Sequence, residues 1–194
     1  AEGDCGACTV VRVNYKGDTH PFQAINSCLV QIGQVDGLEI LTIEGLVPIN
    51  MGSLTPVQEK MASANGTQCG FCTPGFICAL FALGQSEEKI CDNVIHDALA
   101  GNLCRCTGYR PIIEAAREGC QKPIEYRPLQ PPKSRTKHRV RDQNFYAPKT
   151  LKNLTLLRSR YPEAMLLAGG TDLGLSISKE RQQPENIIHI AQVK

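Results

Sequence analysis

Four cysteines in two close pairs constrain this chain more than any other feature of its sequence. Cys69 and Cys72 form a C-x2-C pair, and Cys104 and Cys106 form a C-x-C pair further along. The four thiols can close on one metal centre if the chain between the pairs folds back on itself. Thiolates prefer soft centres such as iron–sulfur clusters, zinc or Cu(I), but structural zinc sites favour two C-x2-C pairs at shorter separation. A [2Fe–2S] cluster takes four cysteine ligands, so the pattern points first to iron and electron transfer.

A second cysteine group lies at the start of the chain. Cys5 and Cys8 form another C-x2-C pair, and Cys28 follows. Plant-type [2Fe–2S] ferredoxins use C-x4-C-x2-C with a distant fourth cysteine, which would place the first ligand one residue before Ala1. We therefore expect this sequence to be a fragment of a longer one. A thioredoxin-like dithiol and a zinc knuckle are the alternatives; the first lacks a following βαβ pattern, and the second cysteine set favours a cluster.

Composition narrows the class of protein. The chain has 194 residues and a net charge of +2, which gives no case for binding nucleic acid or a membrane. No apolar run approaches the ~18 residues of a membrane-spanning helix. Ten cysteines without a visible signal peptide are typical of metal ligands in a reducing compartment rather than of disulfides. We therefore expect a cytoplasmic protein.

The hydrophobic patterns predict an α+β fold. Residues 1–50 are predicted to be rich in strands, with strands near 9–15 and 38–43. Between these strands, residues 24–32 are predicted to form a short helix that carries Cys28.

Residues 51–122 are predicted to be helical. Ser53 or Thr55 can cap a first helix with Pro56 in its first turn. Pro74 suits the first turn of a second helix, and Ser86 is the expected cap of a third. The expected helices cover residues 56–65, 76–83, 86–99 and 112–118. Each of the later cysteine pairs then precedes a helix, whose N-terminal N–H groups favour an anionic thiolate cluster.

Residues 123–143 are predicted to be a solvated linker, because prolines are frequent and a basic run follows them. The run consists of Lys133, Arg135, Lys137, Arg139 and Arg141. Residues 144–194 are predicted to contain a helix capped by Thr150, a buried strand at 164–168 and another strand at 187–190. About fifty residues make a poor independent core, so we expect a domain that begins here and is cut off.

Three motifs resemble one known family. Residues 2–10 read EGDCGACTV, residues 68–75 read QCGFCTPG, and residues 101–112 read GNLCRCTGYRPI. Together they closely resemble the iron–sulfur portion of the molybdenum hydroxylases, which include xanthine dehydrogenases, aldehyde oxidases, and carbon monoxide and nicotinate dehydrogenases. The resemblance covers roughly residues 1–120. It implies a β-grasp ferredoxin domain followed by a four-helix domain with two-fold symmetry, each holding one [2Fe–2S] cluster.

The resemblance also implies roles for individual residues. Cys5, Cys8 and Cys28 would ligate the outer cluster, and the later four cysteines would ligate the inner cluster, nearest the molybdopterin. Gln68 and Cys106 would also approach the pterin. No residue of this chain is expected to act as a general base or nucleophile.

A further segment resembles the loop that holds the FAD pyrophosphate in the same family. It consists of Leu166, Leu167, Ala168, Gly169, Gly170, Thr171, Asp172 and Leu173. Glycines allow the backbone to approach a phosphate, and the following N–H groups can bind it. By itself, Gly-Gly-Thr-Asp is also compatible with an ordinary turn between a strand and a helix. Clusters and flavin on one chain resemble the small subunit of xanthine dehydrogenase or a single-chain enzyme.

The function implied is electron transfer. Electrons would leave a molybdopterin centre on a partner subunit or domain, pass through the inner and outer clusters to FAD, and reach NAD or another acceptor. Three alternatives stay open: an aldehyde oxidase or other molybdenum hydroxylase, a zinc-stabilised binding module, and a free ferredoxin-like carrier. The sequence does not indicate the substrate, the final acceptor or the oligomeric state.

The remaining cysteines and histidines are expected to have no chemical role. Buried structural thiols are predicted at Cys78, Cys91 and Cys120. Ordinary surface or hydrogen-bonded histidines are predicted at His20, His96, His138 and His189. Arg105 and Arg110 flank the C-x-C pair, where they can offset cluster charge, meet a partner chain or end a helix.

Overall fold

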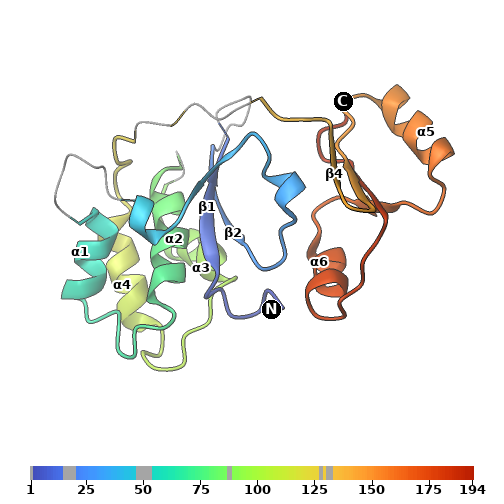
Figure 1. Cartoon of the computed structure of the whole chain (residues 1–194). Coiled ribbons are helices and arrows are strands. Elements are labelled where there is room, and N and C mark those ends of the chain that lie inside the picture. The colour runs from blue at the N-terminus through green and yellow to red at the C-terminus, as the bar shows by residue number, and fades with distance from the viewer. Residues whose placement is uncertain (1, 15–20, 47–53, 87–88, 127–128, 130–132) are drawn as a thin grey trace. The chain divides into compact units, whose positions relative to one another are not determined.

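The computed structural model describes residues 2–14, 21–46, 54–86, 89–126, 129 and 133–194 (Figure 1). It divides into two compact units, which we describe separately. One unit contains residues 3–27 and 39–130, and the other contains residues 1–2, 28–38 and 131–194. Both combine helices with a small sheet, so the predicted α+β class is confirmed. Among the described residues, no helix is both long and apolar enough to span a bilayer.

The first unit begins with a three-stranded antiparallel sheet, in the order β2-β1-β3. Its strands are β1 (Thr9–Val13), β2 (Phe22–Asn26) and β3 (Glu39–Leu41). Alternate residues of β1 are buried, as the sequence pattern predicts for a half-buried strand. The helix predicted at 24–32 is wrong. Antiparallel pairing of β2 with β1 overrides the local preference there, and Cys28 lies in the turn after β2.

Four helices complete the first unit. They are α1 (Pro56–Ser63), α2 (Thr73–Gly84), α3 (Asp92–Leu99) and α4 (Arg110–Gly119). The predicted start of α1 is confirmed, because Thr55 and Gln58 form a reciprocal capping box. The predicted start of the third helix at Ser86 is wrong. The Ser86 hydroxyl donates to Leu83 O at 2.7 Å, and so closes the end of α2 instead of opening α3.

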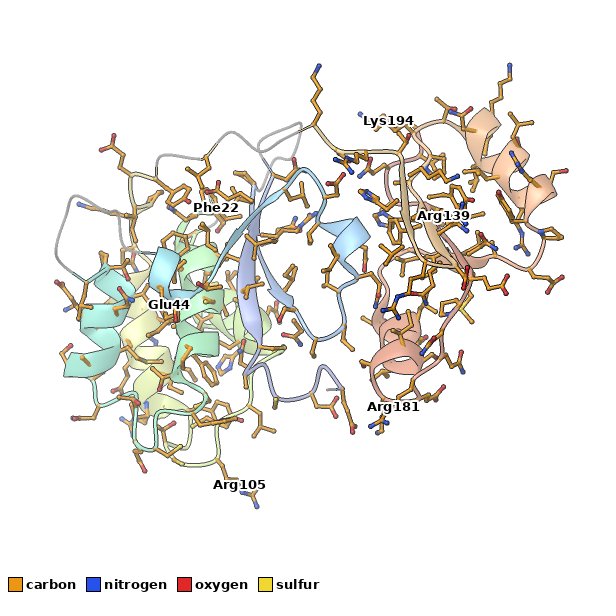
Figure 2. All side chains as sticks on the ribbon, viewed as in Figure 1. Phe22, Glu44, Arg105, Arg139, Arg181 and Lys194 are labelled. Carbon is orange, nitrogen blue, oxygen red and sulfur yellow. The ribbon has the colours of Figure 1, made fainter. Side chains whose placement is uncertain are left out.

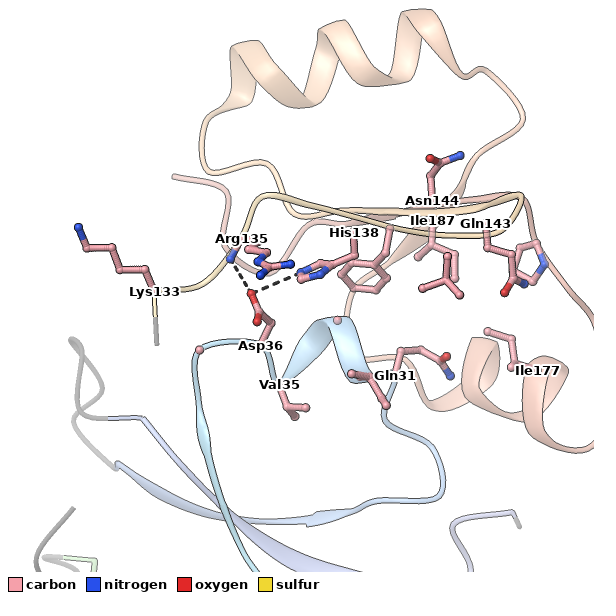
Figure 3. Close-up of a pocket in the computed structure, with 16 residues that line it drawn as sticks. Gln31, Val35, Asp36, Lys133, Arg135, His138, Gln143, Asn144, Ile177 and Ile187 are labelled. Carbon is pink, nitrogen blue, oxygen red and sulfur yellow. Dashed lines mark hydrogen bonds and ion pairs between the residues drawn. The ribbon is translucent and has the colours of Figure 1, made fainter. Parts of the chain in front are cut away.

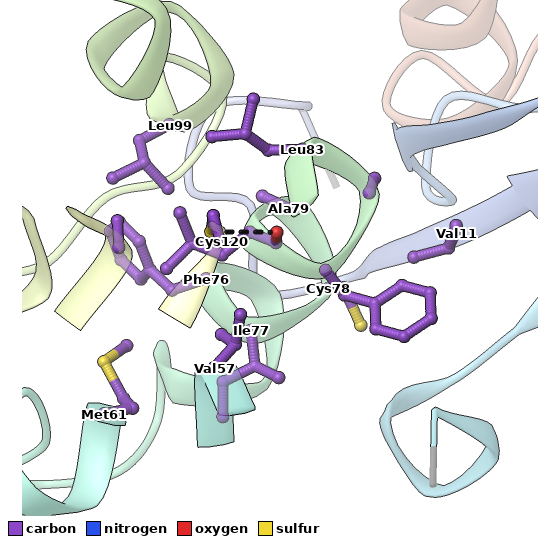
Figure 4. Packing of buried hydrophobic residues seen from close by; sticks show 14 of the residues in the cluster. Val11, Val57, Met61, Phe76, Ile77, Cys78, Ala79, Leu83, Leu99 and Cys120 are labelled. Carbon is purple, nitrogen blue, oxygen red and sulfur yellow. Dashed lines mark hydrogen bonds between the residues drawn. The ribbon is translucent and has the colours of Figure 1, made fainter. Parts of the chain in front are cut away.

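The sheet and the four helices share one hydrophobic core. Helix α2 is buried from Gly75 to Gly84 and packs against β1 (Figure 4). Val11 on β1 and Phe76 on α2 are fully buried in the same cluster, together with Ile112 on α4. Phe22 on β2 lies at the edge of this core, where its ring contacts Phe81 edge-on at 6.0 Å (Figure 2). Folding of the sheet and of the helices is therefore coupled through common packing.

The second unit contains a four-stranded mixed sheet in the order β4-β5-β7-β6. Its strands are β4 (Lys137–Val140), β5 (Gln143–Tyr146), β6 (Met165–Leu167) and β7 (Asn186–His189). Strand β4 pairs antiparallel with β5, whereas β7 pairs parallel with both β5 and β6. Strand β4 lies inside the predicted linker, so that part of the basic run is a paired strand rather than a solvated connector.

Three short helices belong to this unit. They are the 3-10 turn η1 (Ile32–Gln34) and the α-helices α5 (Leu151–Arg160) and α6 (Thr171–Ser178). Thr150 caps α5 by accepting from Asn153 N at 3.3 Å, as predicted. The buried residues Tyr146, Ala164 and Ile188 form a small core of their own.

Candidate metal centre and phosphate-binding loop

The two later cysteine pairs come together in the structure. Cys72 is the N-cap of α2, and the loop that carries Cys104 and Cys106 leads into α4. Cys106 Sγ donates to Cys69 Sγ at 3.5 Å, and the thiols of Cys72 and Cys104 hydrogen-bond to each other. Among the described residues, no three His, Cys, Asp or Glu side chains already have the geometry of a metal site. The four thiols therefore lie together as two contacting pairs.

Each pair contains one thiol with a lowered pKa and one thiol with a raised pKa. Burial raises the pKa of Cys104, but hydrogen bonds from the Thr107 hydroxyl and from the N–H groups of Thr107 and Cys106 outweigh it and lower the pKa to about 7. Burial, with its hydrogen bond to Cys104, raises the pKa of Cys72 to about 11. This pair can therefore hold one thiolate near neutral pH.

The second pair behaves in the same way. The Phe71 N–H group and the thiol of Cys106 lower the pKa of Cys69. Donation of the same hydrogen bond raises the pKa of Cys106. Because thiolates are the form that binds soft metals, the donor set fits a four-thiolate centre such as a [2Fe–2S] cluster.

The site is buried on one side and open on the other. Cys104 is buried, whereas Cys69 and Cys106 are exposed. Gln68 is exposed beside Cys69, and the Phe71 side chain is 75% exposed. Arg105 projects from the loop into solvent (Figure 2). The exposed edge of the site therefore carries an aromatic and a cationic side chain.

Thr107 and Tyr109 organise the loop around Cys104, and sequence reasoning did not single them out. Thr107 Oγ1 lies 3.1 Å from Cys104 Sγ, and Thr107 N donates to the same sulfur at 3.4 Å. Tyr109 N donates to Thr107 Oγ1 at 3.2 Å, which leaves the threonine hydroxyl proton available for the sulfur. The Tyr109 hydroxyl accepts from Cys104 N at 2.9 Å. The signal that could have identified them is their place directly after the C-x-C pair.

The first cysteine group lies in the loop that precedes β1. Ser27 donates to Cys8 O through its hydroxyl at 2.9 Å and its N–H at 3.4 Å, so the residue before Cys28 is tied to the loop. Leu103 N donates to Cys5 O at 3.0 Å, which connects this loop to the residue before Cys104. The three ligand assignments and the identity of a fourth ligand stay predictions.

The other cysteines follow the expectation with one exception. Cys78 and Cys120 are buried, and burial raises their pKa values to about 11 and about 12, respectively. Cys120 also donates to Leu80 O at 3.3 Å. Cys91 is exposed, so its prediction as a buried thiol is wrong; it is the N-cap of α3 and not part of the apolar helix face.

The described histidines also follow the expectation with one exception. His96 is exposed, as expected, and His20 lies outside the described residues. His138 Nε2 lies 3.3 Å from the Asp36 carboxylate. His189 is buried, its Nδ1 has no hydrogen-bond partner within the described part of the chain, and burial lowers its pKa. The prediction of an ordinary surface or hydrogen-bonded histidine is therefore wrong for His189.

The predicted phosphate loop joins β6 to α6. Gly170 is the N-cap of α6 with a φ of 95°, a conformation that favours glycine. A side chain at Gly169 would meet nothing within 4 Å, so there is space beside the backbone there, and Gly169 O accepts from Gln34 Nε2 at 3.3 Å. Leu167 is buried and anchors the loop, whereas Thr171 and Asp172 are exposed at the start of the helix. These features fit a phosphate at the N-terminus of α6.

A cavity of about 670 Å³ lies in the same unit, between η1 and the strands β4 and β5 (Figure 3). Asp36 accepts from Arg135 N at 2.5 Å at its edge and faces His138, while Phe145 and Ile187 form an apolar wall. None of the residues predicted for the metal centre or the phosphate loop lines it. No predicted function is therefore connected with this cavity.

Two family models match the chain. Residues 42–117 match a [2Fe–2S] binding domain, and residues 139–194 match the FAD binding domain in molybdopterin dehydrogenase.

Curated relatives extend over nearly the whole chain. Xanthine dehydrogenase 1 of Arabidopsis thaliana is 33% identical over 99% of this chain, and aldehyde oxidase 2 of Mus musculus is 32% identical over 92% of it. This chain spans only 19% and 17% of those two proteins.

Solved structures match over 61% of the chain. The quinoline 2-oxidoreductase from Pseudomonas putida 86 is 31% identical with a TM-score of 0.51, and 67% of that chain is covered. The aldehyde oxidoreductase from Desulfovibrio gigas is 33% identical with a TM-score of 0.52, and 12% of that chain is covered.

Proposed function

Since this chain belongs to the molybdenum hydroxylases, the family of xanthine dehydrogenase and aldehyde oxidase, and carries their [2Fe–2S] and FAD-binding region, we propose that it is the electron-transfer portion of a xanthine dehydrogenase-like enzyme. The observation that supports this most directly is the meeting of four thiols in two pairs, each with one acidic member. Bound clusters would supply one-electron carriers, and bound FAD would join them to a two-electron acceptor.

The residues of the chain have distinct parts in this proposal. Cys69, Cys72, Cys104 and Cys106 would hold the inner cluster. Cys5, Cys8 and Cys28 would supply ligands of the outer cluster, in a sheet that we infer to be part of a β-grasp ferredoxin domain. The segment from Leu166 to Leu173 would bind the FAD pyrophosphate through backbone N–H groups at the start of α6.

The exposed edge of the inner site is the place where we expect the molybdopterin-bearing partner. Cys69, Cys106 and Gln68 are exposed there, and Phe71 offers an apolar side chain that would be buried by such a contact. The partner would be a large subunit or a further domain, and electrons would leave the flavin for NAD or another acceptor. We place this assembly in the cytoplasm, where free thiols stay reduced.

The test is the metal content and EPR spectrum of the full-length protein with its partner. The proposal predicts iron and acid-labile sulfide in equal amounts and two distinct [2Fe–2S] signals. Cys104→Ser should abolish one of the two signals and block electron flow to the flavin, because it removes a ligand. Cys91→Ser, an exposed thiol outside both groups, should leave both signals unchanged. Zinc without labile sulfide would reject the proposal in favour of a zinc-stabilised module.

A further inference from the structure

The side chain of Asn102 joins the two cysteine sites. Asn102 is buried, with 8% of its surface exposed, and it lies two residues before Cys104. Its Nδ2 donates to Gly6 O at 3.2 Å and to Thr9 Oγ1 at 3.1 Å. Gly6 lies between Cys5 and Cys8. The side-chain amide of Asn102, in the loop that carries Cys104, therefore hydrogen-bonds to the middle of the Cys5–Cys8 loop.

The carbonyl oxygen of Gly6, which accepts from Asn102, also accepts hydrogen bonds from other donors. Gly6 O also accepts from Thr9 N at 3.0 Å and from Thr9 Oγ1 at 2.6 Å. A carbonyl oxygen has two lone pairs, so three donors saturate it. Asn26 extends the network, because its Oδ1 lies 3.2 Å from Thr9 Oγ1 and its Nδ2 donates to Gly3 O at 2.8 Å. The loop around Cys5 and Cys8 is therefore fixed at several backbone positions.

The backbone is tightly packed where Asn102 contacts the Cys5–Cys8 loop. A Cβ atom on Gly6 would lie 2.3 Å from Asn102 Nδ2, and a Cβ atom on Gly75 would lie 2.2 Å from Gly6 O. Gly75 belongs to the first turn of α2, three residues after Cys72. Elements from both cysteine sites thus meet at Gly6 O with no space for a side chain.

Next to Asn102, a backbone hydrogen bond links the two sites directly. Leu103 N donates to Cys5 O at 3.0 Å. One route from Cys5 to Cys104 consists of covalent bonds and this one hydrogen bond. Electronic coupling is stronger through such a route than across a gap, so its strength depends on keeping the hydrogen bond short.

From these contacts we infer that Asn102 is a positioning residue that sets the electronic coupling between the inner and outer clusters. It holds the Cys5–Cys8 loop against the Cys104 loop, and keeps the hydrogen bond between Cys5 and Leu103 in place. The inference rests on the proposed function, because it requires a cluster at each site. The side-chain amide of Asn102 hydrogen-bonds to Gly6 and Thr9, so we expect it to act through the geometry of the loops.

The experiment compares Asn102→Ala with wild type in the full-length protein and its partner. EPR at low temperature measures the magnetic interaction between the two reduced clusters, and fast reduction of the inner site followed optically measures the rate of transfer between them. Asn102→Ala should keep both EPR signals, weaken the spin–spin interaction and slow the transfer several-fold. Asn93→Ala, the same change at an exposed position of α3, should match wild type.

A second pair of variants covers the case in which Asn102→Ala does not fold. Thr9→Val removes the hydroxyl that Asn102 contacts and should weaken the interaction in the same direction, whereas Thr9→Ser keeps the hydroxyl and should restore it. Wild-type coupling and rate in both Asn102→Ala and Thr9→Val would overturn the inference. Loss of the outer signal in these variants would also overturn it, since Asn102 would then serve assembly. Absence of two signals in wild type would instead reject the proposed function.

Discussion

Thr107 acts directly on an inner cysteine without being a predicted ligand itself. Its hydroxyl and its N–H both face Cys104 Sγ, and together they help to lower the pKa of that thiol to about 7. Hydrogen bonds to sulfur stabilise the more negative, reduced form of an iron–sulfur cluster and so raise its reduction potential. Thr107 is therefore expected to tune the potential of the inner site.

Replacing Thr107 with valine tests this role, because valine has the same shape without the hydroxyl. Thr107→Val should lower the reduction potential of the inner cluster by an amount on the order of tens of millivolts, where about 59 mV corresponds to a tenfold change for one electron. The potential of the outer cluster should not change. An EPR-monitored redox titration measures both, with Thr107→Ser as the control that keeps the hydroxyl. A lower potential in Thr107→Ser as well would contradict the assignment to the hydroxyl.

At the residue scale, the sequence predicts which cysteines gather but not what surrounds them. The C-x2-C and C-x-C spacing identifies Cys69, Cys72, Cys104 and Cys106, because short spacings act locally. The hydrogen bonds of the Asn102 side chain go to Gly6 and Thr9, more than ninety residues earlier. No local sequence pattern indicates such a contact. Cys91 was mispredicted for a related reason, since its exposure depends on where α3 begins.

Among the elements, α1 and α4 pack against each other in the first unit. Gly119, the last residue of α4, faces the backbone of α1, and a Cβ atom there would lie 2.9 Å from Val57 Cα. Gly84, the last residue of α2, is less crowded, with its nearest contact at 3.4 Å from Cys120 Cα. Two glycines at equivalent helix positions therefore differ in the space around them.

This difference predicts opposite effects of the same substitution. Gly119→Ala should reduce the free energy of unfolding by about 1–3 kcal/mol, because backbone must move to accommodate the methyl group. Gly84→Ala should be neutral or stabilising by about 0.5 kcal/mol, since alanine favours the helix. Urea denaturation of both variants measures the two free energies. Equal effects would show that helix propensity, and not the contact between α1 and α4, decides the outcome.

Helices with strong end signals and strands with a clear hydrophobic pattern, such as β1, were predictable, whereas β2 and β4 were not. Thr150 marked the start of α5, and Thr55 was one of two caps predicted for α1, because a cap uses neighbouring residues. Strands β2 and β4 were missed, since each exists through pairing with another strand, β1 and β5 respectively. Ser86 misled because the same side chain can end one helix or begin the next.

For the whole molecule, the segment that follows α4 is bonded back to the first unit. Gln85 exchanges two hydrogen bonds with the Ile124 backbone, at 3.0 Å and 2.9 Å. The Tyr126 hydroxyl donates to the buried carboxylate of Glu39 at 2.8 Å, and Leu129 N also donates to it. The Tyr126 ring packs edge-on against Phe22 at 5.7 Å. The start of the predicted linker is thus part of the folded unit.

A double-mutant cycle can measure this attachment. Tyr126→Phe should cost about 1–3 kcal/mol, because it leaves a buried carboxylate with a lost partner. Glu39→Gln should weaken the same contact, and the double variant should be less destabilised than the sum of the two, with a coupling of about 0.5–3 kcal/mol. Urea denaturation gives the free energies, and hydrogen exchange at Leu129 reports the local opening. Strict additivity would show that the two side chains do not interact.

The order of the later cysteine pairs and the glycine loop along the chain was predictable, because each carries a contiguous motif inside a region that matches a family model. The shared core of the sheet and the helices was not predictable, since hydrophobic periodicity reports which face of an element is buried but not against which partner. Val11 and Phe76 both have the pattern of core residues, yet only the structure shows that they belong to the same core.

That shared core limits how such a chain can be recombined. A chimera that replaced the strands before residue 46 with those of an unrelated ferredoxin would leave the buried surface of α2 without the side chains of Val11, Val13 and Leu41. The foreign strands would also have to offer a carbonyl at the place of Gly6 and a hydroxyl at the place of Thr9 to receive the Asn102 amide. The sheet and the four helices are therefore exchangeable as a pair, and grafting one without the other would expose apolar surface and a buried amide to water.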